Sequence, residues 1–583
     1  MLWMRRSMVG SCCAAYSPSG DMSAHVSPRI ALAPFQYKDV AVTGGPLAAQ
    51  ARGARRFYLD LNEDSLLQGF RLRAGLPAPG KPMGGWYDPD GFAAAHPFGQ
   101  YISALARIYA NTGDERYKAK TARLVHGFHV AMAPDGFFFA SKKVAREWPC
   151  YIYDKMCIAI RDAYTLTGDA EALSVLRRMT DWAYTRLPRR SDEWYTLPEN
   201  LYKCYELTKD RRYLTMAAQY DYSKGYYDVF ARGDNAFTPE RHAYSHVNSL
   251  SSSAKAYEFS GNVKFLRATE IAWRYLTTTQ MYASGGWGSD EHFVEAGHGK
   301  LAESLTTSKK NFETPCGTYA NVNLDRYLLR FTGDSKYGDN MERVLLNGIL
   351  AALPPKRDGR SFYYSSYQPG STKEFFPDVW PCCNGTYAEI AADYPLDIYF
   401  RAPHLLYVNL FADSTVRWRL GTQTVFVTQR TGYPATSTTE FSVRMRHPSS
   451  FSLDVRKPEW CAAIPNVEVN GKQLALPSLF SGHVIVKRVW RNGDTIRVNF
   501  PPALRFEPID AQTPNQCALM FGPLLLVALA SKDVELHGDR AKPDAWIRRD
   551  PGTPCDFVTN DGVRFRPLYL VNAESYTTYC HLH

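Results

Sequence analysis

The sequence predicts a helical (α/α)6 barrel followed by a β-sandwich. A helix-ending turn recurs between about residues 95 and 350, and the periodicity of apolar residues changes from helical to strand-like near residue 400. The chain has 583 residues, more than one ordinary hydrophobic core accommodates, which predicts two or three domains.

The recurring turn consists of Thr-Gly-Asp or a close variant at the end of an apolar-periodic helix. It occurs at residues 109–114, 164–169, 205–210, 257–262 and 330–334, with spacings of 41 to 72 residues. Glycine takes the left-handed conformation that ends a helix, and aspartate caps the next helix. Each turn therefore predicts an αα-hairpin, and stacked hairpins form either a solenoid or a closed toroid. Long polar insertions such as 279–312 favour the closed barrel, because such loops line a barrel mouth.

Beyond residue 400, apolar residues alternate with a period of two. Residues 405–410, 424–427, 441–445 and 495–500 are typical of half-buried strands. Asn470-Gly471 and Asn492-Gly493-Asp494 predict hairpin turns. We therefore expect a leader or disordered tail at 1–50, the barrel at 51–400, the sandwich at 401–525, and a C-terminal extension at 526–583 that packs on the rest.

The composition is typical of a soluble globular protein, with 45% hydrophobic and 22% charged residues. The net charge of +10 is spread over short clusters such as 186–190, whereas nucleic-acid binding requires a concentrated basic stripe. No segment reaches the roughly 18 to 20 apolar residues of a membrane helix. We expect neither a nucleic-acid partner nor a membrane span. A weak export-like segment near Arg5-Arg6 leaves cytoplasmic and exported locations both open.

The most unusual feature is the adjacent pair Cys382-Cys383. Neighbouring cysteines rarely bond to each other because the geometry is strained, so metal ligation is a more natural use. The segment 312–318 adds Glu313 and Cys316, and one carboxylate with three thiols is a donor set that suits tetrahedral zinc. Cys316 and Cys382 lie 66 residues apart. The residues alone therefore support a zinc site and three buried, apolar cysteines equally.

A third stretch, residues 285–293, is rich in glycine and carries Glu291. Small neighbours leave this carboxylate free on a loop shortly before Glu313. Such a residue could act as a general acid, although loop carboxylates are more often simply solvated.

These stretches together resemble glycoside hydrolase family 127, which includes bacterial β-L-arabinofuranosidases. The resemblance rests on Gly285-Gly286-x-Gly288, Glu291-x-Phe293, Glu313-Thr314, Cys316 and Cys382-Cys383, and it covers roughly residues 55 to 520. It implies a retaining glycosidase that releases β-L-arabinofuranose or a related sugar from a glycan. It also implies a Zn2+ ion held by Glu313, Cys316, Cys382 and Cys383, with Cys382 as the nucleophile and Glu291 as the acid/base.

The chain departs from the family pattern at two places. Pro315 adds one residue between Glu313 and Cys316, and Glu291 lies further from Glu313 than in the family, so Glu295 is the alternative acid. His96 and His246 lie at expected helix starts and match family positions that bind substrate. Tyr153 and Trp86 are further candidates for sugar contacts.

Two other functions compete with the hydrolase. A non-catalytic glycan-binding protein on the same fold is disfavoured because every expected reactive residue is present. A zinc-dependent α-toroid transferase is disfavoured by the strand-rich second half and by the irregular repeat. The expected partner is a carbohydrate, such as an arabinose-containing glycan, and a homodimer remains open.

Overall fold

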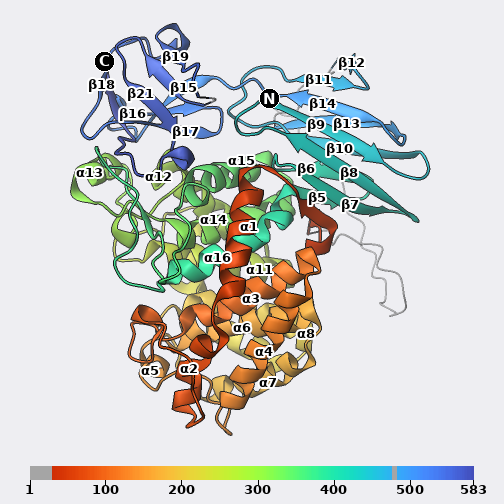
Figure 1. The fold of residues 1–583 in the computed structure, drawn as a ribbon, viewed down its shortest axis with the longest axis vertical. Helices are drawn as coiled ribbons and strands as arrows, with labels where there is room; N and C mark the ends of the chain where they lie inside the picture. The colour runs from red at the N-terminus through yellow and green to blue at the C-terminus, as the bar shows by residue number, and fades with distance from the viewer. Residues whose placement is uncertain (1–28, 476–481, 554) are drawn as a thin grey trace.

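The structure, a computed structural model, describes residues 29–475, 482–553 and 555–583. Figure 1 shows a helical body below, two sheets at the upper right and a further sheet at the upper left. Most of the expected leader lies outside the described residues. Residues 29–50 are described, and they form strands β1 (Ala33–Pro34) and β2 (Val40–Val42) and the start of helix α1.

The helical body is a closed double ring, as predicted. Each inner helix contacts the next one, and the last contacts the first. The inner helices are α3 (His96–Thr112), α6 (Pro149–Thr167), α8 (Leu197–Thr208), α11 (Ala243–Ser260), α14 (Thr314–Thr332) and α16 (Cys382–Ile398). The outer helices are α1 (Gly45–Asp60), α4 (Glu115–Ala131), α7 (Ala170–Arg186), α9 (Arg211–Gln219), α12 (Val263–Thr279) and α15 (Ser335–Val344). Shorter helices lie in the connections: α2 (Glu63–Arg73), α5 (Val144–Glu147), α10 (Asp228–Arg232) and α13 (Lys300–Thr307).

The recurring turns join inner to outer helices in the way their residues dictate. Gly113, Gly168, Gly261 and Gly333 are left-handed, and Lys209 takes this conformation at the remaining turn. At all five turns the following Asp or Asn side chain accepts a hydrogen bond from a first-turn N–H of the outer helix. These paired stop and start signals fold the helices back on each other and produce the hairpins.

A consequence of this arrangement is that the six inner helices begin near one end of the barrel. Their first residues and the loops before them include the sequence-predicted reactive residues. His96 begins α3, Cys382 begins α16, and Glu313 immediately precedes α14. The barrel mouth is thus the place where these chemically distinctive residues meet.

The predicted β-sandwich follows the barrel. One sheet has the order β1-β5-β6-β10-β13 and the other β12-β11-β14-β9-β8-β7-β2. Its later strands are β5 (Tyr399–Ala402), β6 (Leu405–Val408), β7 (Ser414–Leu420), β8 (Gln423–Thr431), β9 (Thr438–Arg444), β10 (Ser449–Arg456), β11 (Asn466–Val469), β12 (Lys472–Gln473), β13 (His483–Trp490) and β14 (Thr495–Asn499). Asn470-Gly471 forms the expected hairpin between β11 and β12. The turn at 492–494 instead connects β13 and β14, which belong to different sheets.

A third sheet forms the C-terminal part of the chain. Its strands are β15 (Leu504–Pro508), β16 (Gln516–Phe521), β17 (Leu524–Ala528), β18 (Glu535–Leu536), β19 (Ile547–Arg549), β20 (Phe557–Thr559), β21 (Arg564–Pro567) and β22 (Cys580–Leu582). The expected boundary at residue 526 falls inside β17, and the change of sheet occurs near residue 504. Strand periodicity cannot separate adjacent sheets, because pairing partners are a tertiary property.

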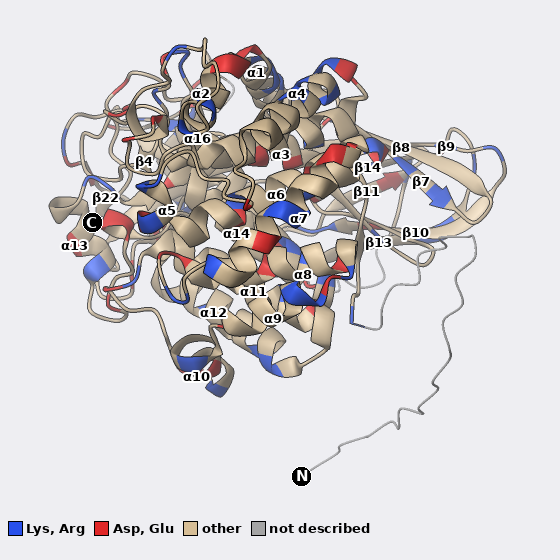
Figure 2. Cartoon of the chain, turned by 90° about the horizontal axis from the view of Figure 1, so that it is seen from below, with Lys and Arg blue, Asp and Glu red and all other residues tan. Residues whose placement is uncertain are grey.

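Charged residues of both signs intermingle over the barrel helices, as Figure 2 shows from below. Buried ion pairs also link the parts of the molecule. Arg456 of β10, fully buried, pairs with Glu342 of α15 at 2.6 Å and so joins the sandwich to the barrel. Among the described residues, none of the helices combines the length and apolarity that a bilayer crossing requires.

Candidate active site

Glu313, Cys316, Cys382 and Cys383 form one buried cluster at the barrel mouth. Their ligand atoms all lie within 4.8 Å of one another. Cys316 Sγ lies 3.4 Å from both other Sγ atoms, and Glu313 Oε1 lies 3.3 Å from Cys382 Sγ and 3.8 Å from Cys383 Sγ. Tetrahedral zinc with thiolate ligands requires donor separations of about 3.8 Å, given a Zn–S bond of about 2.3 Å. The cluster therefore fits a four-coordinate metal.

Local sequence explains why these side chains converge. Pro315 occupies the first turn of α14, where a missing N–H costs nothing, and Glu313 and Cys316 on either side of it both belong to the cluster. Glu313 is the N-cap of this helix, Cys316 lies in its first turn, and Cys382 begins α16. Two helix N-termini therefore face the cluster, and their partial positive charge stabilises thiolate and carboxylate groups.

The three thiols differ in exposure and in proton affinity. Cys382 is 9% exposed, whereas Cys316 and Cys383 are completely buried. Burial raises the pKa of all three, but hydrogen bonds from Cys316, Cys383 and the Tyr363 hydroxyl outweigh it at Cys382 and hold its pKa well below the ordinary range. The pKa values of Cys316 and Cys383 stay well above that range. Cys382 is thus the most accessible thiol of the cluster, and the hydrogen bonds around it favour its thiolate form.

His242 contacts the Glu313 carboxylate at Oε2, the oxygen that does not face the thiols. Its Nε2 lies 3.2 Å from Glu313 Oε2, and its Nδ1 lies 3.1 Å from Glu193 Oε1. Burial lowers the pKa of His242, but hydrogen bonds to the two glutamates outweigh burial and raise it well above the ordinary value. Burial raises the pKa of Glu313 to about 8, with the Cys382 thiolate as the next cause. Partners of this kind orient a metal ligand and tune its basicity.

The glycine-rich loop brings Glu291 next to the cluster. The Tyr364 hydroxyl donates a hydrogen bond to Glu291 Oε1, and Tyr364 is the cross-strand partner of Glu313 in the short pair β3 (Phe312–Glu313) and β4 (Tyr364–Ser365). Burial, followed by this bond, raises the pKa of Tyr364. Glu295 is exposed and lies 3.5 Å from His298, a neighbour in its own loop. Of the two acids considered from sequence, Glu291 therefore lies at the site.

The expected sugar-binding residues divide into two groups. His96 is buried, and because a carbonyl only accepts, its Nδ1–H donates to Ala93 O at 2.7 Å. Its Nε2 is buried without a hydrogen-bond partner, and burial lowers its pKa to about 4. A neutral His96 thus has an acceptor at Nε2 that no protein donor satisfies. Trp86 lies beside it, with ring centroids 6.0 Å apart, and it also contacts Tyr363.

Tyr153 and His246 do not reach the cluster. Tyr153 is fully buried, and its hydroxyl faces Thr180 of the outer helix α7 at 3.4 Å. His246 is held within the protein at both ring nitrogens, by His242 O and the Tyr222 hydroxyl. The hydrogen bonds of both side chains go to protein groups outside the cluster, and their expected sugar contacts stay predictions. Tyr151, two positions and so about 200° of helical rotation from Tyr153, lies beside His96, and His242, which immediately precedes α11, contacts Glu313.

Sequence reasoning missed several residues around the cluster. Tyr151 lies beside His96, with ring centroids 6.0 Å apart, and the buried Tyr244 hydroxyl has no hydrogen-bond partner. Glu193, Tyr363 and Tyr364 come from connecting segments without a distinctive motif. For His242 a signal was available, since it immediately precedes the start of α11.

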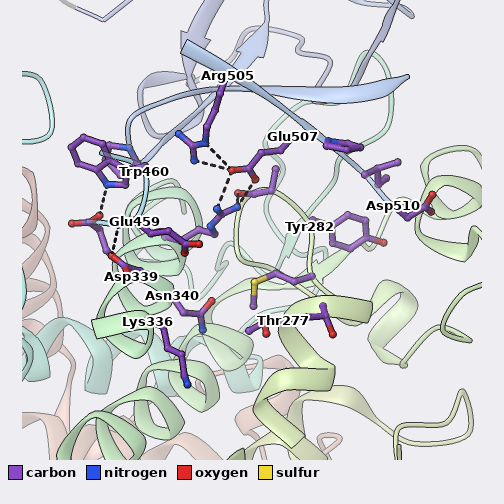
Figure 3. A pocket seen from close by; sticks show the side chains of 18 of the residues that line it. Thr277, Tyr282, Lys336, Asp339, Asn340, Glu459, Trp460, Arg505, Glu507 and Asp510 are labelled. Carbon is purple, nitrogen blue, oxygen red and sulfur yellow. Dashed lines mark hydrogen bonds and ion pairs between the residues drawn. The ribbon is translucent and has the colours of Figure 1, made fainter. Parts of the chain in front are cut away.

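A large cavity of about 810 Å³ lies away from this cluster, at the seam between the barrel and the C-terminal sheet. Figure 3 shows Trp460, Arg505 and Glu507 around it, with Tyr282 on the opposite wall. It contains none of the cluster residues. Cavity size therefore does not identify the candidate site. The site is identified by the thiols and carboxylates that lie close together at the barrel mouth.

The comparisons with known proteins agree with this geometry. Residues 39–396 match the model of the β-L-arabinofuranosidase GH127 catalytic domain, and residues 405–502 match the GH127 middle domain. No curated protein matches the sequence. A solved structure of a GH127 β-L-arabinofuranosidase from Geobacillus stearothermophilus T6 is similar, with 19% identity over 93% of this chain and 100% of that chain and a TM-score of 0.72.

The structure of the GH127 β-arabinofuranosidase BT3674 is also similar, with 18% identity over 96% of this chain and 99% of that chain and a TM-score of 0.75. At these identities, the structural matches establish the fold. The catalytic-domain match spans more than half of the sequence and includes the whole cysteine–glutamate cluster. The chain therefore belongs to glycoside hydrolase family 127 and is a glycosidase.

Proposed function

We propose that this glycosidase is a retaining exo-acting hydrolase that releases β-L-arabinofuranose or a closely related sugar, with Cys382 as the nucleophile and Glu291 as the acid/base. The observation that carries the proposal is the difference among the three clustered thiols. Cys382 alone among them is exposed to any extent, at the start of α16 beside the Tyr363 hydroxyl, whereas Cys316 and Cys383 are completely buried. A nucleophile must reach the anomeric carbon, and among the clustered thiols only Cys382 is exposed enough to do so.

The donor set supports zinc as the cofactor. Glu313, Cys316, Cys382 and Cys383 would hold the ion, because three soft thiolates and one carboxylate match its preferences in number and type. A bound zinc ion would supply the positive charge that keeps the thiols deprotonated at neutral pH. Glu193 and His242 would then fix the orientation of Glu313.

The reaction proceeds in two displacements. Cys382 Sγ attacks the anomeric carbon while the bond to the leaving oxygen breaks, and Glu291 gives its proton to that oxygen. The product of this step is a thioglycoside on Cys382. Glu291 then takes a proton from water, the water oxygen attacks the anomeric carbon, and the C–S bond breaks. Two inversions leave the anomeric configuration of the released sugar unchanged.

The polar atoms around Cys382 support a small neutral sugar. His96 Nε2 and the Tyr244 hydroxyl are buried without partners, so a ligand hydroxyl at each would satisfy a group that otherwise carries a desolvation cost. Trp86 and Tyr151 supply aromatic surfaces beside them. The arabinose assignment draws on the solved family members, one described as a β-L-arabinofuranosidase and the other as a β-arabinofuranosidase.

The test is the purified protein on aryl β-L-arabinofuranosides alongside aryl pyranosides. We expect turnover of the furanoside, loss of activity in Cys382→Ser, and an adduct on Cys382 after treatment with a sugar epoxide. Glu291→Gln should lose turnover of poor leaving groups far more than of activated aryl glycosides, because only poor leaving groups need protonation. An active Cys382→Ser enzyme, or an adduct on a carboxylate, would refute the mechanism.

A further inference from the structure

The end of the chain contacts the two loops that complete the active site. The first loop, residues 281–293, carries Glu291, and the second, residues 361–371, carries Tyr363 and Tyr364. Residues 576–579, just before β22, lie against both loops and belong to the C-terminal sheet domain. Figure 1 places this domain above the green helices of the barrel, on the side of α12, α13 and α15.

Ala283, in the first loop, is held at both of its backbone groups. Its N–H donates to the Tyr579 hydroxyl at 2.8 Å, and its carbonyl accepts from Arg343 Nη1 at 3.3 Å. Arg343 is itself held by Glu507 of β15, with contacts of 2.6 and 3.0 Å. Figure 3 shows Glu507 at the centre of these ion pairs, between Arg505 and a second guanidinium. Tyr579 directly, and Glu507 through Arg343, thus attach the loop to the C-terminal domain.

The second loop is attached to the same segment. The Tyr576 hydroxyl donates to Ser366 O at 2.9 Å, and the Gly370 N–H donates to Thr577 Oγ1 at 3.0 Å. The two loops are also bonded to each other, through the side chains of Ser284 and Tyr367 and through those of Glu291 and Tyr364. Glu291 therefore belongs to two hydrogen-bonded loops that are both attached to residues 576–579 of the C-terminal domain.

The first loop needs such support because its backbone is strained. Asp290 and Glu291 are consecutive non-glycine residues with φ of 52° and 67°. Left-handed conformations are unfavourable for residues with a Cβ, and they persist only where surrounding contacts determine them. Asp290 is itself held by the 308–310 segment, because its N–H donates to Lys310 O at 2.6 Å and its carboxylate accepts from the Ser308 hydroxyl at 2.7 Å. Ala283 is the attachment on the other side of the glycines, and its release would loosen the part of the loop that leads to Glu291.

We infer that the C-terminal sheet domain is part of the catalytic apparatus, and that Tyr579 is a positioning residue that holds Glu291 in place through Ala283. This inference rests on the proposed role of Glu291 as the acid/base. The domain follows the matched middle domain, which ends at residue 502, so its contribution lies outside both matched segments.

The test compares Tyr579→Phe with Tyr569→Phe, a variant in the same domain that loses the same hydroxyl from a side chain that bonds to neither loop. We expect Tyr579→Phe to lower kcat on an unactivated arabinoside by about tenfold, the scale of one lost hydrogen bond to a buried backbone group. Turnover of an activated aryl arabinoside should fall less than twofold, with KM and metal content unchanged. Tyr569→Phe should match the wild type on both substrates.

Hydrogen exchange of peptides spanning 283–293 provides a readout that does not require activity. Exchange there should accelerate in Tyr579→Phe and not in Tyr569→Phe. Equal losses on both substrates in Tyr579→Phe, or unchanged exchange in these peptides, would overturn the inference. Glu291→Gln, measured in parallel, separates the two hypotheses. If the loss of kcat depends on the leaving group in Glu291→Gln but not in Tyr579→Phe, only the positioning role of Tyr579 is refuted. If the loss of kcat in Glu291→Gln does not depend on the leaving group, the acid/base assignment itself is refuted.

Discussion

Replacing Cys383 with serine should weaken metal binding about a hundredfold while leaving the fold intact. Cys383 is fully buried, and its Sγ lies 3.4 Å from Cys316 Sγ and 3.8 Å from Glu313 Oε1. Four-ligand structural zinc sites bind with about 10 to 16 kcal/mol, so each donor accounts for about 3 kcal/mol. A serine hydroxyl is a harder donor that stays protonated, so it does not replace the Cys383 thiolate as a ligand. Loss of that ligand corresponds to an increase of about a hundredfold in the Kd for zinc.

The assay is elemental analysis of protein purified without added metal, followed by competition with a chelator. The wild type should hold close to one zinc per chain. Cys461→Ser is the matched control, because Cys461 Sγ donates only to Ala463 O at 3.5 Å, a bond that a serine hydroxyl can retain. Zinc content equal to the wild type in Cys383→Ser, with Kd within a few-fold, would refute the ligand assignment.

Three further predictions address the surroundings of the site. His242→Asn should weaken metal binding by about 10- to 100-fold in the same competition, because Glu313 loses the partner that orients it, and an unchanged affinity would contradict that role. Tyr153→Phe should leave turnover of an aryl arabinoside within twofold of the wild type, since the hydroxyl faces Thr180, and a large loss of kcat would place Tyr153 at the substrate after all. At Glu507, burial raises the pKa, but Arg343 and Arg505 outweigh burial and hold it at about 2. Because this folded-state pKa is depressed, the stabilisation is complete above about pH 4.5 and is lost as pH falls toward 2. It amounts to about 3 kcal/mol, so denaturant unfolding should show a steeper decline between pH 5 and 2 in the wild type than in Glu507→Gln, and parallel curves would refute the ion-pair contribution.

Local signals in the sequence predicted the secondary structure and the helix hairpins better than they predicted the boundaries between domains. Glycine and aspartate at the five turns determine helix ends and starts through their own φ angles and side-chain acceptors, so the hairpins were predictable without knowledge of neighbours. The turn at 492–494 carried an equally clear signal, but whether it joins strands of one sheet depends on pairing partners distant in the chain. For the same reason, the third sheet was not separable from the sandwich.

The candidate site divides in a similar way. The donor residues Glu313, Cys316, Cys382 and Cys383 were identifiable because their residue types are rare and chemically distinctive, and the structure brings their ligand atoms together. Tyr364 is a common residue type in a connecting segment, so nothing local marks it, and His242 is marked only by its position just before α11. Their roles arise from contacts with Glu291 and Glu313, 73 and 71 residues away in the chain.

The sequence by itself determined the helix hairpins, the switch to strands and the identity of the four residues that form the candidate metal cluster, because each depends on the conformational preference or chemistry of single residues. Only the tertiary structure decided which thiol is accessible, which glutamate reaches the cluster and how the C-terminal segment holds the loops. Those properties depend on burial and on distances between segments far apart in the chain. Glu291 and Glu295 are indistinguishable as isolated loop carboxylates, and they differ only because Tyr364 bonds to the former while the latter is exposed beside His298.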